Sequence, residues 1–188
     1  MAKSDEEYLR VYDKYGKYTG LKEKRRVIHE KGLFHREVAL WVIDIENSSI
    51  LLQKRTPDKM FGANKLGVCA GHIAGNETIK EALYKEAKEE LGIDLEQYRV
   101  HKLISFKKQE KNNNCFIYHF YTLSYVPLKE IDIQEEELSR VLYMDYDFVK
   151  KCIINKDERF MIPYDENHKK LFQKLDNIIK REKKKYAK

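Results

Sequence analysis

The sequence predicts a mixed α/β (α+β) fold, and three observations lead to this class. The run 38–43 is apolar and rich in β-branched residues, as in a buried strand. Residues 78–91 contain no proline or glycine and are rich in Ala, Leu, Lys and Glu, which predicts a helix. Near the C-terminus, apolar residues recur with a helical period at Leu171, Leu175 and Ile179. Strands and helices therefore share one chain.

The first half of the chain is predicted to contain mostly strands. Residues 1–33 mix aromatic and charged side chains with several glycines, which predicts an extension of short strands and turns. The strand at 38–43 is followed by a polar turn and by a second strand at 50–55, so these two should pair as a hairpin. A loop at 56–62 contains proline and glycine and leads to a short apolar strand at 66–70.

The second half begins with the helix 78–91, which Gly92 should end. Strands are predicted at 98–106, 115–125 and 138–144, then a short helix at 147–154 and a closing amphipathic helix. Because there is no internal repeat or low-complexity linker, we interpret residues 1–188 as one domain, with the extension 1–33 and a core 34–188.

Composition restricts the partners and the compartment. The net charge of +6 comes partly from the basic run 180–185, which is more typical of a solvated helix end than of an arm that binds nucleic acid. The three widely spaced cysteines predict neither a disulfide framework nor a zinc knuckle, which favours the reducing cytoplasm. With no long apolar run, neither a signal peptide nor a membrane span is expected.

The helix 78–91 carries the strongest chemical signal. On a helical wheel, Ile79, Ala82 and Leu83 form an apolar stripe, and Glu86 and Glu90 fall within roughly 20° of Ile79. These two carboxylates should therefore point inward as a like-charge i,i+4 pair, which costs a few tenths of a kcal/mol even in water. A hard divalent cation such as Mg²⁺ or Mn²⁺ would compensate them, since such ions prefer carboxylate oxygens and bridge to phosphates.

The loop before this helix allows a ligand to approach closely. It reads Gly71-His72-Ile73-Ala74-Gly75, and the following Glu77-Thr78 can cap the helix. The whole segment resembles the Nudix box. The matching positions are Gly71, Glu77, Glu86, Ala87, Glu89, Glu90, Gly92 and Ile93. One position departs from the pattern, because Lys85 stands where the family has arginine, so the charge is kept and the planar fork is lost.

The resemblance extends beyond this segment. Residues 35–43, residues 51–55, Lys59 and the Gly71-His72 pair look like the branch of Nudix proteins that resembles isopentenyl-diphosphate isomerase, which also carries an N-terminal hairpin. The resemblance implies an α/β/α sandwich around a mixed sheet, metal-dependent hydrolysis of a phosphoanhydride in a nucleoside diphosphate linked to another moiety, and a homodimer.

It also implies roles for single residues. Glu86 and Glu90 would be the principal ligands of Mg²⁺ or Mn²⁺, with the Gly71 carbonyl as an additional ligand. Glu89 would be a further ligand or the general base, while Lys85 and Glu77 would orient the acidic side chains.

Further residues are candidates for substrate binding and proton transfer. Phosphoryl-transfer sites need cations beside the metal, and Arg55, Lys54 and Lys59 are the candidates to hold phosphates of a small-molecule diphosphate substrate. The acidic run 135–137 is a second candidate source of the base.

Two alternatives remain open. The first is an isomerase of the same superfamily, for which Cys69, His72 and His35 are present, although Cys69 is one residue too far from Gly71-His72 and the strand after 115 lacks the expected glutamate. The second is a binding module that has lost turnover. The spacing of His29, His101 and His168 does not indicate a metal site, and His119 is ambiguous.

Overall fold

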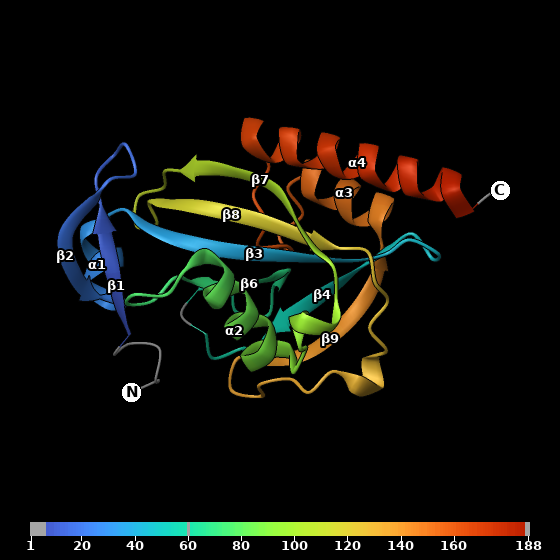
Figure 1. The fold of residues 1–188 in the computed structure, drawn as a ribbon, viewed down its shortest axis with the longest axis horizontal. Coiled ribbons are helices and arrows are strands. Elements are labelled where there is room, and N and C mark those ends of the chain that lie inside the picture. Colours follow the sequence, from blue (N-terminus) through green and yellow to red (C-terminus); the bar gives the residue numbers. More distant parts are fainter. Residues whose placement is uncertain (1–6, 60, 187–188) are drawn as a thin grey trace.

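The fold was described from a computed structural model, in which residues 7–59 and 61–186 are placed well enough to describe (Figure 1). In chain order the elements are β1 (Tyr8–Tyr12), β2 (Tyr18–Lys24), α1 (Arg25–Lys31), β3 (His35–Asp44), β4 (Ser49–Arg55), β5 (Leu66–Gly67), β6 (Cys69–His72), α2 (Ile79–Leu91), η2 (Leu95–Gln97), β7 (Val100–Lys108), β8 (Cys115–Thr122), η3 (Leu128–Glu130), β9 (Leu138–Asp145), α3 (Tyr146–Ile154) and α4 (Glu166–Tyr186). The predicted elements of the core are therefore present, with ends that differ by a few residues.

The main sheet is mixed, as the resemblance implied. Strand β3 runs parallel to β8 along its length, whereas the pairs β3–β6, β7–β8 and β4–β9 are antiparallel. The predicted hairpin of β3 and β4 is confirmed, but these strands pair only at Ile43–Ile50 and Asp44–Ser49. The reason is that β6 pairs with the earlier part of β3 and β9 pairs with β4.

Helices cover both faces of this sheet, which confirms the α/β/α arrangement (Figure 1). On one face α2 packs against a buried cluster that includes Val38, Leu40 and Leu51. On the other face α3 and α4 pack against a cluster that includes Trp41 and Leu52. Because side chains alternate along a strand, neighbouring residues of β3 and β4 belong to different cores.

The N-terminal extension is a separate two-stranded sheet of β1 and β2, so the expected hairpin is confirmed. The short helix α1, which follows it directly, was not predicted. Ile28 of α1 packs with Leu9 and Val11 of β1 in a small core of its own. Residues 1–6 of the predicted extension lie outside the described residues. Within the described ranges, we find no helix that is both long and apolar enough to cross a membrane.

Candidate functional site

The ends of α2 are defined by local contacts. Thr78 caps the N-terminus: its side chain accepts a hydrogen bond from the Glu81 backbone, and the Glu81 side chain accepts one from the Thr78 backbone. Gly92 ends the helix with φ +66°, a conformation that glycine adopts without steric strain. Between these ends the apolar residues of α2 pack against the sheet and set the rotation of the helix, so that Glu90 faces the sheet with only 6% of its surface exposed, while Glu89 is exposed.

Glu86 lies directly against the backbone of β6. A Cβ atom added at Gly71 would overlap the Glu86 carboxylate, so a side chain at this position would displace that carboxylate. The structure thus brings Glu86, Glu90 and Gly71 together, as the sequence predicted for a metal site. Glu89 lies at the rim of the same group, close enough to affect the pKa of Glu86.

The buried carboxylates repel one another electrostatically. Burial, followed by the charge of Glu90, raises the pKa of Glu86 to about 8. Burial also raises the pKa of Glu90, against the opposing effect of hydrogen bonds from Gln53 and Cys69. Two inward carboxylates beside a close backbone segment offer the hard oxygen donors that Mg²⁺ and Mn²⁺ prefer, so the residues present fit such an ion.

Lys85, the residue before Glu86, contacts two other glutamates. Its Nζ lies 3.2 Å from Glu77 Oε1 and 3.7 Å from Glu7 Oε1, and Glu77 Oε2 accepts a hydrogen bond of 2.9 Å from the Ala74 backbone. Burial alone would lower the pKa of Lys85, but Glu77 outweighs it and the pKa is raised. The two predicted orienting residues therefore contact each other, and Glu7, which precedes β1, joins them without having been predicted.

The predicted phosphate-binding cations do not all lie on the same face of the sheet. Arg55 affects the pKa of Glu90 and lies on the α2 face, two residues from Gln53, whereas alternation directs Lys54 to the other face. Glu137 Oε1 lies 2.6 Å from Lys59 Nζ, and its Oε2 lies 3.6 Å from an Arg55 guanidinium nitrogen. Of the acidic run 135–137, only Glu137 is partly buried, in contact with two cations.

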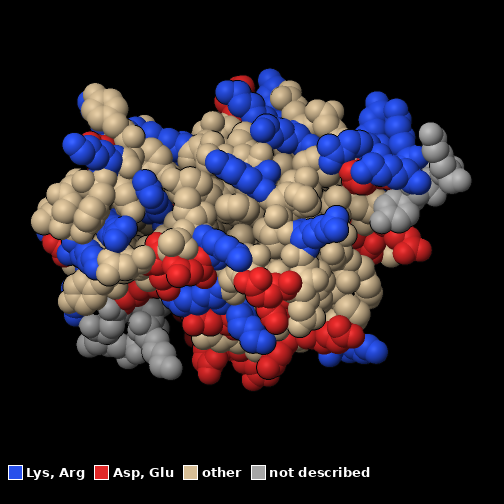
Figure 2. Space-filling view, viewed as in Figure 1, with Lys and Arg blue, Asp and Glu red and all other residues tan. Residues whose placement is uncertain are grey.

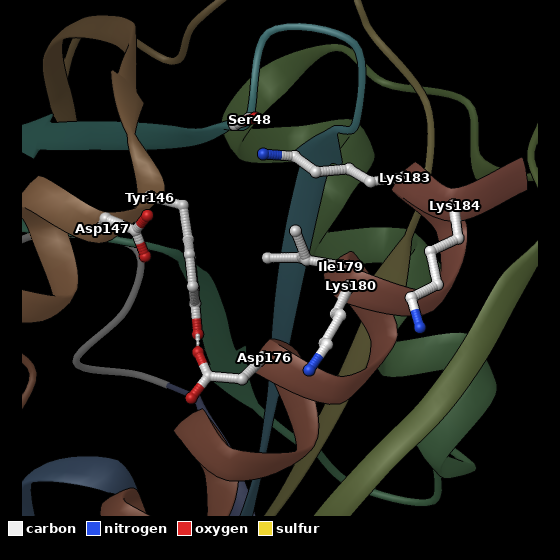
Figure 3. A pocket seen from close by; sticks show the side chains of 8 residues that line it. All are labelled: Ser48, Tyr146, Asp147, Asp176, Ile179, Lys180, Lys183 and Lys184. Atoms are coloured by element: carbon white, nitrogen blue, oxygen red, sulfur yellow. Dashed lines mark hydrogen bonds between the residues drawn. The ribbon is translucent and has the colours of Figure 1, made fainter. Parts of the chain in front are cut away.

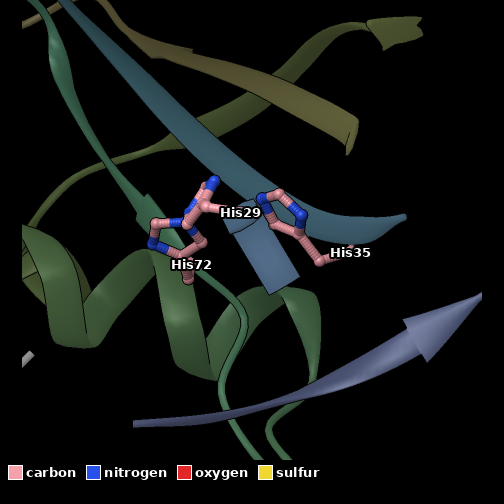
Figure 4. Close-up of side chains that lie close together, drawn as sticks. All are labelled: His29, His35 and His72. Atoms are coloured by element: carbon pink, nitrogen blue, oxygen red, sulfur yellow. The ribbon is translucent and has the colours of Figure 1, made fainter. Parts of the chain in front are cut away.

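A second cluster of titratable groups consists of His29, His35 and His72, which come from α1, β3 and β6 (Figure 4). One ring nitrogen of each lies within 4.8 Å of the others, a spacing that could hold a metal ion. The sequence spacing had not placed His29 in such a cluster. No local spacing could have revealed it, because its Nε2 lies 3.1 Å from that of a residue 43 positions later, His72.

The second cluster also contains an acid. Glu37 Oε1 lies 3.0 Å from His35 Nε2 and 3.8 Å from His72 Nε2. Burial would raise the pKa of Glu37, but the hydrogen bond from His35 and the charge of His72 hold it well below its usual value. Burial lowers the pKa of His72 and of His29, which favours the neutral rings that metals bind.

Cys69 does not belong to this cluster. It is buried in the core on the α2 face, as a structural cysteine was expected to be, and it lies close enough to Glu90 for each group to affect the pKa of the other. His72, three residues later, pairs with Glu37, while Cys69 pairs with Leu40. Since an odd separation along a strand reverses the side-chain direction, Cys69 and His72 lie on opposite faces of the sheet.

A separate hollow of about 450 Å³ lies between α3 and α4 (Figure 3). Its lining includes Lys180, Lys183 and Lys184, and the hydroxyl of Tyr146 donates to Asp176 at 2.8 Å on one side. Lysine and arginine gather over α4 and β7, and acidic side chains gather around α2 (Figure 2). Because the lining includes no residue of α2, this hollow is distinct from the carboxylate site.

Comparisons with known proteins agree with this geometry. A model of the NUDIX domain matches residues 33–164. The chain is 30% identical over 184 residues to Nudix hydrolase 3 from Arabidopsis thaliana, which covers 93% of this chain but 23% of that longer protein. It is also 30% identical over 154 residues to isopentenyl-diphosphate Δ-isomerase 2 from Photorhabdus laumondii, covering 81% of this chain and 73% of that one.

A solved structure gives independent support for the fold. The crystal structure of DR0079 from Deinococcus radiodurans superimposes with a TM-score of 0.63 at 17% identity, covering 79% of this chain and 90% of that one. The family match covers most of the chain and contains α2, β6 and the loop between them. The chain therefore belongs to the Nudix hydrolase family.

Proposed function

We propose that this protein hydrolyses a phosphoanhydride bond in a nucleoside diphosphate linked to another moiety, with Mg²⁺ or Mn²⁺ as cofactor. The observation that carries the proposal is the pair of inward carboxylates, partly buried Glu86 and buried Glu90, beside the backbone of Gly71. Burial raises the pKa of both carboxylates, and the charge of Glu90 raises that of Glu86 further, so binding of a divalent cation would favour their ionised forms.

Each residue of the site has a proposed role. Glu86, Glu90 and the Gly71 carbonyl would hold the ion, and Glu89 would add a ligand or accept a proton from the attacking water. The ion, when bound, would offset the negative charge that develops on the phosphate oxygens. Lys85 and Glu77 would keep the acidic side chains oriented through their 3.2 Å contact.

The substrate phosphates would meet the cations beside Glu90. Arg55 and Lys59 would fill this role, whereas Lys54, which alternation directs to the other face of the sheet, would not contact the same phosphates. Glu137 already neutralises Arg55 and Lys59 and stays the second candidate base. Binding of a phosphate to these cations would release Glu137, whose carboxylate could then accept a proton.

The partners follow from this chemistry. We propose a small-molecule diphosphate as substrate, a homodimer as the assembly, and no nucleic-acid partner. Cys69, Cys115 and Cys152 are free and buried, which supports a reducing, cytoplasmic location.

The first test is release of phosphate or nucleotide from a panel of nucleoside-diphosphate compounds, with Mg²⁺, with Mn²⁺ and with chelator. We expect turnover that depends on the metal.

Glu90→Gln should abolish turnover with little change in thermal unfolding, because it removes one proposed ligand and keeps the side-chain volume. Glu158→Gln, at an exposed turn position to which the proposal gives no role, is the control. A fully active Glu90→Gln variant would contradict the proposed metal site.

A second candidate function is isomerisation of a prenyl diphosphate, favoured by the cluster of His29, His35 and His72 and by the isomerase relative. The direction of Cys69 opposes it, because the resemblance requires a cysteine acid beside the histidines and this thiol lies on the other face. An isomerisation assay run beside the hydrolysis panel separates the two. Inactivity in both assays, with Mn²⁺ binding retained, would instead indicate a binding module.

A further inference from the structure

Gln53 of β4 is a buried amide directly beneath the carboxylate helix. Only 4% of its surface is exposed, and it shares the α2 face of the sheet with the core residue Leu51. Its side-chain Nε2 donates a hydrogen bond of 2.9 Å to Glu90 Oε2. The partners are 37 residues apart, so the contact depends on how β4 and α2 pack together.

This hydrogen bond restricts the Glu90 carboxylate. An ionised carboxylate is an acceptor only, and the Nε2 of Gln53 is a donor only. Because both side chains are buried, the bond fixes the direction of Oε2 and limits rotation of the carboxylate. Glu90 is therefore held in one orientation, beside Glu86 and the Gly71 backbone.

The other end of the Gln53 amide is unusual for a core position. Its Oε1 is buried and has no hydrogen-bond partner among the described residues. An apolar side chain, as at Leu51, would fill the same space without burying an unpaired acceptor. The amide is thus unfavourable for packing alone, and its contact with Glu90 explains its presence.

We propose that Gln53 is a positioning residue that orients Glu90 for the divalent cation. The proposal rests on the proposed function, since it assumes that Glu90 is a ligand. Hydrogen-bond partners of metal ligands fix the ligand geometry, and their loss reduces metal affinity or activity by about 10–100-fold. Gln53 should act in this way although it does not itself reach the ion.

The test is Gln53→Met, which keeps a side chain of similar size and removes the amide. Mn²⁺ affinity of the purified, metal-free protein is measured by calorimetry and by the EPR signal of free Mn²⁺. We expect the dissociation constant to rise by about 10–100-fold. Thermal stability should change little, because the variant removes the unpaired Oε1 but also leaves Glu90 Oε2 without its donor. In the hydrolysis assay the Mn²⁺ concentration for half-maximal activity should rise, while KM for the substrate at saturating metal stays close to that of the unmodified protein.

Two further variants keep the test decisive. Gln173→Met, at an exposed position of α4 on the other side of the sheet, should retain full Mn²⁺ affinity. Gln53→Asn keeps a polar group but is one methylene too short to reach Glu90. It should therefore weaken Mn²⁺ binding even if the methionine variant does not fold.

The proposal would be overturned if a folded Gln53 variant bound Mn²⁺ within twofold of the affinity of the unmodified protein while Glu90→Gln lost binding. That result would leave the proposed function intact. Absence of Mn²⁺ binding by the unmodified protein would contradict both.

Discussion

At the scale of single residues, the proposed chemistry of this protein rests on charged side chains that would destabilise the fold if they had no partners. Glu86 and Glu90 are like charges in a buried place, and Lys85 is shared by two further glutamates, Glu77 and Glu7. Lysine offers a point charge with rotatable donors where arginine offers a planar fork. The contact with Glu7 gives Lys85 a second partner and so partly replaces the geometry that the fork would provide.

The pKa of Glu86 predicts how stability depends on pH in the absence of metal. Its folded-state pKa of about 8 lies above the usual value of 4.5, so its contribution is fully present below pH 4.5 and is lost as pH rises toward 8. Glu86→Gln should therefore be more stable than the unmodified protein near pH 8, and this difference should shrink toward pH 5. Urea unfolding in the presence of chelator measures it.

Saturating Mn²⁺ provides the control for that measurement. The ion should stabilise the unmodified protein and not Glu86→Gln, which reverses their order at pH 8. A stability difference that stays constant between pH 5 and pH 8 would show that burial does not perturb Glu86 as described.

At the scale of elements, α2 was the most predictable part of the chain, because its signals are local. Thr78, Gly92 and the apolar spacing between them are all read from consecutive residues. The packing of its apolar stripe on the sheet then determines which carboxylates point inward. The short helix α1 was missed for the opposite reason: its N-terminal residue Lys24 makes no side-chain cap, and its one buried residue, Ile28, depends on β1.

Gly92 allows a direct test of the end of α2. An added Cβ would meet the Asp132 side chain at 2.9 Å and its backbone at 3.1 Å, and the positive φ adds strain. We expect Gly92→Ala to reduce the free energy of unfolding by more than about 1–2 kcal/mol, which is the cost of the left-handed conformation alone. Thermal or urea unfolding measures this.

The matched control is Gly20→Ala, since Gly20 also has a positive φ but nothing within 4 Å of an added Cβ. Gly20→Ala should have the backbone strain without the collision, so its free energy of unfolding should fall less than that of Gly92→Ala. Equal destabilisation of the two variants would show that the contact with Asp132 contributes nothing to the end of α2.

At the scale of the whole molecule, the sheet separates the carboxylate site from the hydrophobic core under α3 and α4. The α2 face carries the carboxylate site, while α3 and α4 bury the other face in a core that includes Trp41 and Phe172, whose rings pack edge to face at 6.0 Å. Stability and metal binding should therefore be separable by mutation.

Phe172→Ala should demonstrate this separation. Phe172 is 2% exposed, and the loss of a buried phenylalanine costs about 3–5 kcal/mol in the free energy of unfolding. Mn²⁺ affinity, measured by calorimetry below the unfolding temperature, should stay unchanged because the site lies on the other face. Phe148→Ala, at a side chain 45% exposed, should change stability by less than about 0.5 kcal/mol. A large loss of Mn²⁺ affinity in Phe172→Ala would mean that the two faces are coupled.

The sequence by itself determined the elements of the core, the helix 79–91 and the inward direction of Glu86 and Glu90, because each depends on neighbours within a few positions along the chain. Only the tertiary structure decided which distant residues meet them. The contacts of Gln53 with Glu90, of Glu137 with Lys59 and of His29 with His72 all join separate elements. The opposite directions of Cys69 and His72 follow from their odd separation along β6, but the face of the sheet that each occupies depends on how β6 pairs with β3.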